Sequence, residues 1–150
     1  MAEILLDTNI LSYCIDTSHR YNQSVIEKIQ SLGIVDSVYI SELSLYEYKS
    51  GIYFLETRLR KKISKALDIV LRDFSLLPLN SIKGGEIFGE IKSVYQNQTG
   101  ISNKAIKKNV IDFILASEAI VHDKVFISND KIFEIIEDMR DDFVLENWVK

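Results

Sequence analysis

The sequence predicts an α/β fold with a central, mainly parallel sheet flanked by helices. Short apolar runs, such as residues 3–6 and 124–128, are typical of strands that are covered on both faces. Segments with helical periodicity separate these runs, which indicates βαβ units. A chain of 150 residues with 47% hydrophobic content is long enough for one domain with a substantial core. We therefore expect a single domain over residues 1–150.

Each expected element is bounded by residues that favour its start or its end. Thr8 and Asn9 favour a helix after the first strand, Ser41 suits a helix cap, and Gly51 suits a helix end. The only proline, Pro78, suits an edge strand or a strand end. We expect strands at 3–7, 37–40, 74–79, 124–128 and 143–145. We expect helices from 10, at 24–32, 41–51, 53–72, 82–95 and 107–122, and from 130, with a loop at 96–102.

The composition excludes several classes of site and location. The net charge of −4 provides no overall basic field, so a polyanion would be held by local basic patches and metal. Cys14 has no second cysteine and no zinc-site spacing with His19 or His122, so we expect a reduced thiol in the core. No run reaches the ~18 apolar residues of a membrane span, and the first residues do not resemble a signal peptide. We expect a cytoplasmic protein.

Two aspartates follow predicted strands. Asp7 closes the first strand, and Asp130 follows the strand at 124–128. Ligands of open parallel α/β sheets bind beyond the carboxyl ends of the strands, so both positions suit a binding site. Both also suit helix N-caps. For Asp7, a binding-site residue and a helix cap are equally good interpretations. For Asp130, considered by itself, the helix cap is the better explanation.

Glu47 lies inside the helix predicted at 41–51. It is four residues from both Leu43 and Gly51, so its face of the helix permits close approach. We interpret it as an inward-facing acid, although an exposed residue near Lys49 explains it better when it is considered alone. Glu42 lies in the first turn of this helix and is interpreted as a partner of the helix dipole.

Asp112 has the most unusual surroundings of the four acids. Apolar residues at 110–111, 113–116 and 119–121 enclose it, so we expect its helix to be largely buried. Burying a carboxylate without a partner costs several kcal/mol or shifts it to the neutral form. Asp112 therefore needs a cation, hydrogen-bond donors or a raised pKa.

Together these acids indicate a metal site. If the strands at 3–7 and 124–128 are parallel neighbours, Asp7 and Asp130 emerge at one edge, and Asp112 facing that edge completes an acidic cleft. Such carboxylates do not stay ionised together without a cation. Oxygen ligands without paired histidines or cysteines favour Mg²⁺ or Mn²⁺. The pattern is typical of nucleases.

Four segments occur in a characteristic order and spacing. They are Leu6–Leu11 (LDTNIL), Glu47 with Gly51, Asn109–Ala116 (NVIDFILA) and Ser128–Phe133 (SNDKIF). This order resembles the PIN-domain family, and most of all the VapC-type toxins of VapBC toxin–antitoxin modules. The resemblance covers essentially the whole chain, including the ending Leu145–Trp148. Three positions depart from the family's common leucine, alanine and threonine: Tyr48, Ser117 and Ser128.

The resemblance implies a PIN-like three-layer fold and a metal-dependent endoribonuclease that is the toxin of a type II toxin–antitoxin module. It implies that Asp7 and Asp112 bind Mg²⁺ or Mn²⁺ most directly. Asp130 would bind the ion directly or through water, and Glu47 would orient water at the metal. With water as the nucleophile, neither a catalytic histidine nor attack by a 2′-hydroxyl is required.

Neighbouring polar residues are candidates for supporting roles. Hydrogen bonds from Thr8, Asn9 and Ser128 are expected to hold the carboxylates in place. Three lysines before the Asp112 helix are candidates for RNA phosphate contacts, although a solvated helix start explains them slightly better. They are Lys104, Lys107 and Lys108.

The expected partners follow mainly from the resemblance. It implies an RNA substrate, a VapB-like antitoxin whose peptide occupies the cleft, and a toxin homodimer. The basic stretch 58–65 suits RNA or an acidic antitoxin segment, but a solvated amphipathic face is the simpler explanation. Tyr39, Tyr46 and Tyr53 are expected in the core or in an interface rather than as base-stacking platforms.

Other enzyme classes lack their motifs. Asn9 stands where a haloacid-dehalogenase-like phosphotransferase needs a second acid, and no pair of adjacent acids for a receiver domain follows Leu6. The chain has neither a phosphate-binding P-loop nor a Gly-x-Ser-x-Gly elbow. Two alternatives remain open: a non-catalytic PIN-like module that binds RNA or protein, and a housekeeping RNA-processing PIN nuclease.

Overall fold

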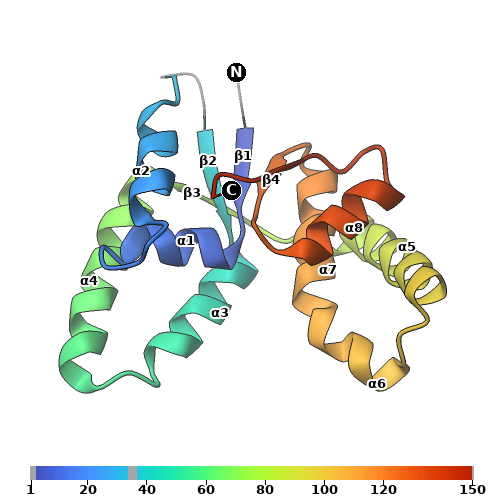
Figure 1. The fold of residues 1–150 in the computed structure, drawn as a ribbon, viewed down its shortest axis with the longest axis horizontal. Helices are drawn as coiled ribbons and strands as arrows, with labels where there is room; N and C mark the ends of the chain where they lie inside the picture. Colours follow the sequence, from blue (N-terminus) through green and yellow to red (C-terminus); the bar gives the residue numbers. More distant parts are fainter. Residues whose placement is uncertain (1–2, 34–36, 150) are drawn as a thin grey trace.

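The sheet at the centre of the molecule is parallel between all neighbouring strands (Figure 1). The structure is a computed structural model that describes residues 3–33 and 37–149. The strands are β1 (Glu3–Leu6), β2 (Ser37–Ser41), β3 (Ser75–Leu77), β4 (Val125–Ile127) and β5 (Leu145–Glu146). Their spatial order is β3-β2-β1-β4-β5. The strands β1 and β4 are therefore parallel neighbours, which is the condition under which the sequence predicts an acidic cleft.

Helices cover both faces of this sheet. They are α1 (Thr8–Ile15), α2 (Asn22–Gln30), α3 (Glu42–Ile52), α4 (Thr57–Asp73), α5 (Ser81–Thr99), α6 (Asn103–Ile106), α7 (Val110–Val121) and α8 (Lys131–Met139), with a 3₁₀ turn at Lys107–Asn109. In Figure 1, α1, α2 and α4 lie on one side of the sheet, and α5, α7 and α8 lie on the other. The predicted three-layer α/β fold is confirmed. Within the described ranges, no helix is both long enough and apolar enough to span a membrane.

The side chains of β1 explain why this strand is apolar throughout. Leu5 packs against Phe113 and Phe126 on the α5–α7–α8 side. Ile4 and Leu6 pack on the opposite side, in the cluster that contains residues of α1. Alternate residues of a strand point to opposite faces, and here both faces are buried. Full burial of such a side chain stabilises the fold by about 1.5–3 kcal/mol.

Several element boundaries differ from the prediction. Gly51 lies inside α3 and does not end it, and the chain turns at 53–56 before α4 begins at Thr57. The helix predicted at 53–72 is therefore shorter, because Glu56 is extended, with φ −59° and ψ 155°. The proline prediction is confirmed, since β3 is an edge strand that ends at Leu77, next to Pro78.

The second half of the chain shows similar differences. Helix α5 continues through Thr99 and ends at Gly100, whose φ of 67° is the left-handed conformation that glycine adopts without strain. The loop predicted at 96–102 is therefore shorter. The helix predicted at 107–122 begins at Val110, after the separate helix α6 and the 3₁₀ turn. The last strand is β5 at 145–146 rather than 143–145.

Helices α5 and α7 pack around a buried carboxylate. Both oxygens of Glu118 in α7 accept from the backbone N–H of Asn80, at 3.1 Å each. His122 Nε2 lies 3.1 Å from Glu118 Oε2. A Cβ atom added to Gly84 of α5 would lie 2.8 Å from Glu118 Oε1. Glycine is therefore needed where α5 passes this carboxylate.

Replacement of Gly84 by alanine is expected to lower the free energy of unfolding by about 1–3 kcal/mol, because the buried Glu118 carboxylate must move away from its donors. Gly85→Ala is the matched control, since a Cβ there has no atom within 4 Å. That control should instead gain about 0.5–1 kcal/mol, because alanine is the better helix former. Urea unfolding followed by circular dichroism measures both. Equal responses of the two glycines would contradict this account of Gly84.

Candidate active site

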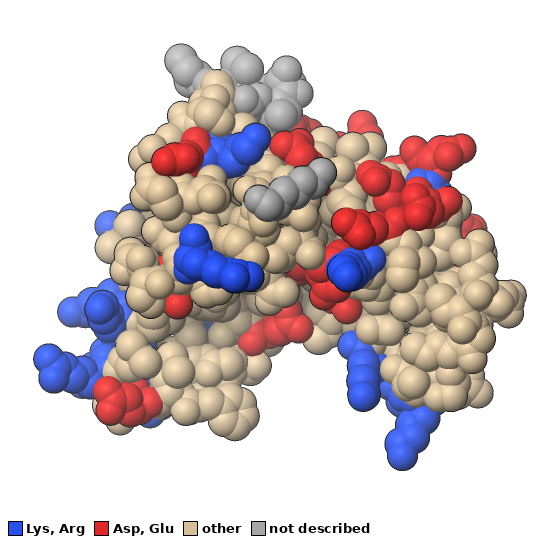
Figure 2. Space-filling view, in the orientation of Figure 1, with Lys and Arg blue, Asp and Glu red and all other residues tan. Residues whose placement is uncertain are grey.

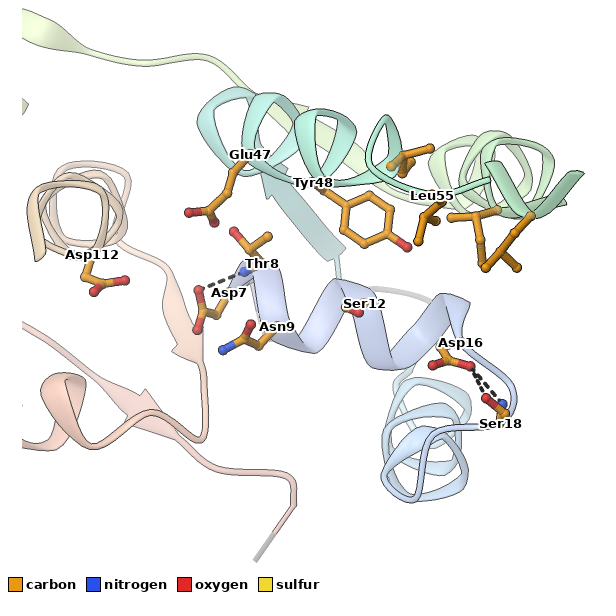
Figure 3. Close-up of a pocket in the computed structure, with 14 residues that line it drawn as sticks. Asp7, Thr8, Asn9, Ser12, Asp16, Ser18, Glu47, Tyr48, Leu55 and Asp112 are labelled. Carbon is orange, nitrogen blue, oxygen red and sulfur yellow. Dashed lines mark hydrogen bonds between the residues drawn. The ribbon is translucent and has the colours of Figure 1, made fainter. Parts of the chain in front are cut away.

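A cleft of about 610 Å³ opens at the carboxyl end of β1 (Figure 3). Residues of α1, α3, α4 and α7 line it, together with residues of the turn after α3. One end of the cleft is acidic, and the side away from α7 has an apolar wall. The acidic end is lined by Asp7, Thr8, Asn9, Glu47 and Asp112, and the apolar wall by Ile52, Leu55, Leu59 and Ile63.

Asp7 lies in the cleft and also caps α1. Its Oδ1 accepts from the backbone N–H of Thr8 at 2.8 Å, and its Oδ2 accepts from Ser128 Oγ at 2.8 Å. The residue is only 4% exposed. Burial raises the pKa of Asp7 to about 6, against the hydrogen bonds from Ser128 and Thr8, and the charges of Asp130 and Glu47 raise it further. The two interpretations of Asp7, helix cap and cleft acid, are therefore compatible.

Ser128 joins Asp7 to the start of α8. Its Oγ donates to Asp7 and accepts from the backbone N–H of Asp130 at 3.1 Å. Asp130 Oδ1 accepts from the backbone N–H of Ile132 at 3.2 Å, so Asp130 is the N-cap of α8. The Asp130 side chain is exposed and does not line the cleft. Its charge nevertheless acts on the pKa values of both Asp7 and Asp112.

Asp112 is less enclosed than the sequence predicts. Helix α7 is largely buried through Phe113, Leu115 and Ala116, but Asp112 itself is only partly buried and lines the cleft. The apolar neighbours in sequence point around the helix toward the core, so they do not cover the carboxylate. Burial is still the largest cause that raises the pKa of Asp112 to about 7, followed by the charges of Asp7, Asp130 and Glu47.

Glu47 projects from α3 toward the space between Asp7 and Asp112 (Figure 3). Its residue is exposed, yet it lines the cleft. Glu42 lines a different surface pocket, with Leu45 and Leu76 among others, so the two glutamates are separated as the sequence predicts. The other candidate residues also fall into two groups, those that line the cleft and those that do not. Thr8 and Asn9 line the cleft, whereas three exposed lysines near its α7 side do not: Lys104, Lys107 and Lys108.

The donor atoms fit a hard divalent cation. All the acidic candidates offer oxygen, and the buried Thr8 Oγ1 beside them has no hydrogen-bond partner in the described part of the chain. Among those residues no three His, Cys, Asp or Glu side chains enclose an ion by themselves. Mg²⁺ suits such an open arrangement, because it binds one or two carboxylates and keeps several waters.

Two residues that line the cleft, Asp16 and Tyr48, were not predicted as site residues. Asp16 lines the cleft, and hydrogen bonds from Ser18 lower the pKa of its carboxyl. Tyr48 also lines the cleft, although the sequence marked it only as a departure from the family pattern. The Asp-Thr-Ser turn after α1 was the one available signal for Asp16. Cys14 is buried as expected, and burial raises the pKa of its thiol to about 12.

The whole arrangement belongs to a known class of domain. Residues 4–138 match the family model described as PIN domain, so this chain belongs to the PIN domain family. No curated protein sequence matches the chain significantly.

Solved structures share this fold at low sequence identity. VapBC2 from Rickettsia felis, bound to a DNA fragment from its promoter, is 24% identical with a TM-score of 0.76, over 97% of this chain and 98% of that chain. VapBC-1 from nontypeable Haemophilus influenzae is 20% identical with a TM-score of 0.73, over 99% of both chains. Mycobacterium tuberculosis VapC20, described as a Sarcin-Ricin loop cleaving toxin, is 9% identical with a TM-score of 0.62, over 88% of this chain and 93% of that chain.

The raised pKa values predict that the metal-free protein loses stability as pH rises. Asp7 and Asp112 have folded pKa values of about 6 and about 7, above the ordinary 3.8. Between pH 3.8 and these folded pKa values, the folded state binds more protons than the unfolded state. The stability that these two carboxyl groups contribute is therefore present at low pH and is lost as pH rises through 6 to 7.

Asp112→Asn should therefore raise the melting temperature in chelator clearly more at about pH 8 than at about pH 5, where Asp112 of the folded protein is still protonated. Asp141→Asn, at an exposed position, is the control for the loss of one charge. Differential scanning calorimetry measures the difference. A variant whose advantage is the same at both pH values would contradict the cluster.

Proposed function

We propose that this PIN-domain protein is a Mg²⁺- or Mn²⁺-dependent endoribonuclease and the toxin of a type II toxin–antitoxin module, with one nuclease domain over residues 1–150. The observation that carries the proposal is the convergence of Asp7, Glu47 and Asp112 on one cleft. Asp7 and Asp112 have pKa values raised by burial and by neighbouring acidic charges, as is expected where a cation normally compensates clustered carboxylates. Membership of the PIN family and the fold of VapC-type neighbours support the same reaction class.

The contacts of each side chain determine the role that we propose for it. Asp7 and Asp112 hold the ion, with Asp130 contributing directly or through water. The Ser128 hydroxyl and the Thr8 N–H fix the Asp7 carboxylate, so its orientation is set before an ion binds. Glu47 is exposed to solvent within the cleft, which suits it to orient the attacking water and to accept its proton.

A bound Mg²⁺ or Mn²⁺ supplies charge stabilisation at the phosphoryl group and lowers the pKa of water. Because water is then the nucleophile, the 2′-hydroxyl of the RNA is not consumed. Cleavage products should therefore carry no 2′,3′-cyclic phosphate. Mapping RNA ends after brief expression identifies which RNA is cut and tests this end chemistry.

Partners are proposed on the same basis. Lys104, Lys107 and Lys108 are exposed at the end of the molecule that carries α6, where Figure 2 shows basic side chains beside the acidic centre. We propose that they contact RNA phosphates. A VapB-like antitoxin, a toxin homodimer and a cytoplasmic location complete the proposal. The VapBC complexes among the neighbours support the antitoxin, and a small reading frame beside this gene would separate a toxin from a housekeeping nuclease.

Purified protein is expected to cleave RNA only with Mg²⁺ or Mn²⁺, and Asp112→Asn should abolish cleavage while circular dichroism stays unchanged. The reason is that Asp112 is a proposed ligand whose ionised form a cation stabilises. Gel analysis of RNA fragments measures this, with Asp141→Asn as the control that retains activity. Undiminished cleavage by Asp112→Asn, or in excess chelator, would contradict the metal-nuclease mechanism.

Loss of the Ser128 hydroxyl should weaken metal binding about 10- to 100-fold, because it frees the Asp7 carboxylate to rotate. Ser128→Ala is compared with Ser128→Thr, which keeps a hydroxyl at the position where the family commonly has threonine. Titration of the melting temperature with Mn²⁺ gives the affinity of each variant. If the alanine variant binds Mn²⁺ as tightly as the threonine variant, Ser128 does not position Asp7.

A further inference from the structure

The turn between α3 and α4, residues 53–56, carries two strongly exposed aromatic rings. Phe54 is 91% exposed and Tyr53 is 71% exposed. Tyr53 was expected in the core or in an interface, and its exposure contradicts the core alternative. Leu55, the next residue after Phe54, lines the acidic cleft (Figure 3). The turn thus forms the rim of the cleft on the side away from α7.

The first turns of α4, which follow this turn in the chain, are rich in basic residues. Residues 53–65 contain five basic residues and one acidic residue, in a chain whose net charge is −4. No ion pair involves any of the five in the part of the chain that the structure describes. They are Arg58, Arg60, Lys61, Lys62 and Lys65. Figure 2 shows basic side chains gathered over the region of α4, opposite those near α6, with acidic side chains between.

Arg60 has a different role from the other four. Its Cζ lies 5.1 Å from the centre of the Tyr53 ring, so the guanidinium covers that ring. Its buried Nε has no hydrogen-bond partner among the described residues. This contact holds Tyr53 against α4 and leaves Phe54 as the freer aromatic face.

We propose that this segment, residues 53–65, is a subsite for unpaired RNA. The proposal rests on the proposed nuclease function, because it specifies the kind of RNA that the same cleft binds. Phe54 stacks on an unpaired base, and the cations of α4 bind the flanking phosphates. An apolar protein surface would cover Phe54 but leave the cations without partners. Acidic side chains of a protein segment would pair with the cations but offer no flat face to Phe54, whereas single-stranded RNA supplies both a base face and phosphates. Fully paired RNA keeps its bases stacked within the helix and offers no free base face to Phe54.

The test measures RNA affinity separately from cleavage. In the Asp112→Asn background, fluorescence anisotropy is recorded with a labelled oligouridine and with a fully paired RNA duplex of equal length. Phe54→Ala should weaken oligouridine binding about tenfold and leave duplex binding unchanged. Phe54→Trp should keep the affinity, whereas Phe54→Leu should lose it although leucine is also apolar. Ile82→Ala, at a position that is 83% exposed on α5, is the control with unchanged affinity.

Salt dependence separates the ring from the cations. Lys61→Ala and Lys62→Ala should each lower the slope of log affinity against log salt by about 0.7, whereas Phe54→Ala should leave the slope unchanged. Unchanged oligouridine binding by Phe54→Ala, or full affinity of Phe54→Leu, would overturn the subsite. A Phe54→Ala variant that alters only self-association in sedimentation would also overturn it and identify a protein contact. Binding that depends on Phe54 in a protein that cleaves no RNA with either metal would overturn the nuclease and support the subsite.

Discussion

The parallel pairing of β1 with β4 is the constraint on which the rest of the site depends. It places Asp7, whose backbone N–H donates to Ile127 at 2.9 Å, beside the residues that follow β4. The Ser128 hydroxyl then reaches Asp7 and also receives the Asp130 backbone N–H. One carboxylate and one hydroxyl therefore join the starts of α1 and α8. Any shift of register between β1 and β4 would separate the Asp7 carboxylate from the Ser128 hydroxyl.

The acidic cleft is a local source of instability that the surrounding core tolerates. Burial and the charges of neighbouring acids raise the pKa values of both Asp7 and Asp112, so ionising these carboxyl groups costs more than it would in water. The cluster lies where buried strands meet the partly buried start of α7, which keeps the carboxylates close despite their repulsion. Such conflict between stability and local chemistry is expected at a functional site. The divalent cation of the proposed function would relieve it, which would link metal binding to stability.

The acidic end of the cleft and its apolar rim belong to different elements, which would separate the proposed chemistry from the proposed recognition of RNA. The acids lie near α7, while the apolar wall and the turn at 53–56 belong to α3 and α4. Helical periodicity continues through 53–72 in the sequence, which concealed the turn at 53–56. The turn exposes Tyr53 and Phe54 because extended backbone at Glu56 redirects the chain before α4 begins. Both rings are thereby available at the surface.

The sequence by itself determined the α/β class, the apolar strands, the caps of α1, α3 and α8, and the acidity of the site. These features are local, because burial on two faces, capping and side-chain chemistry act over a few residues. Only the tertiary structure decided which acids converge. It placed Glu47 in the cleft, left Asp130 outside the cleft lining, opened one side of Asp112, and matched Gly84 to Glu118. Those outcomes depend on packing between elements far apart in the chain, which no local pattern specifies.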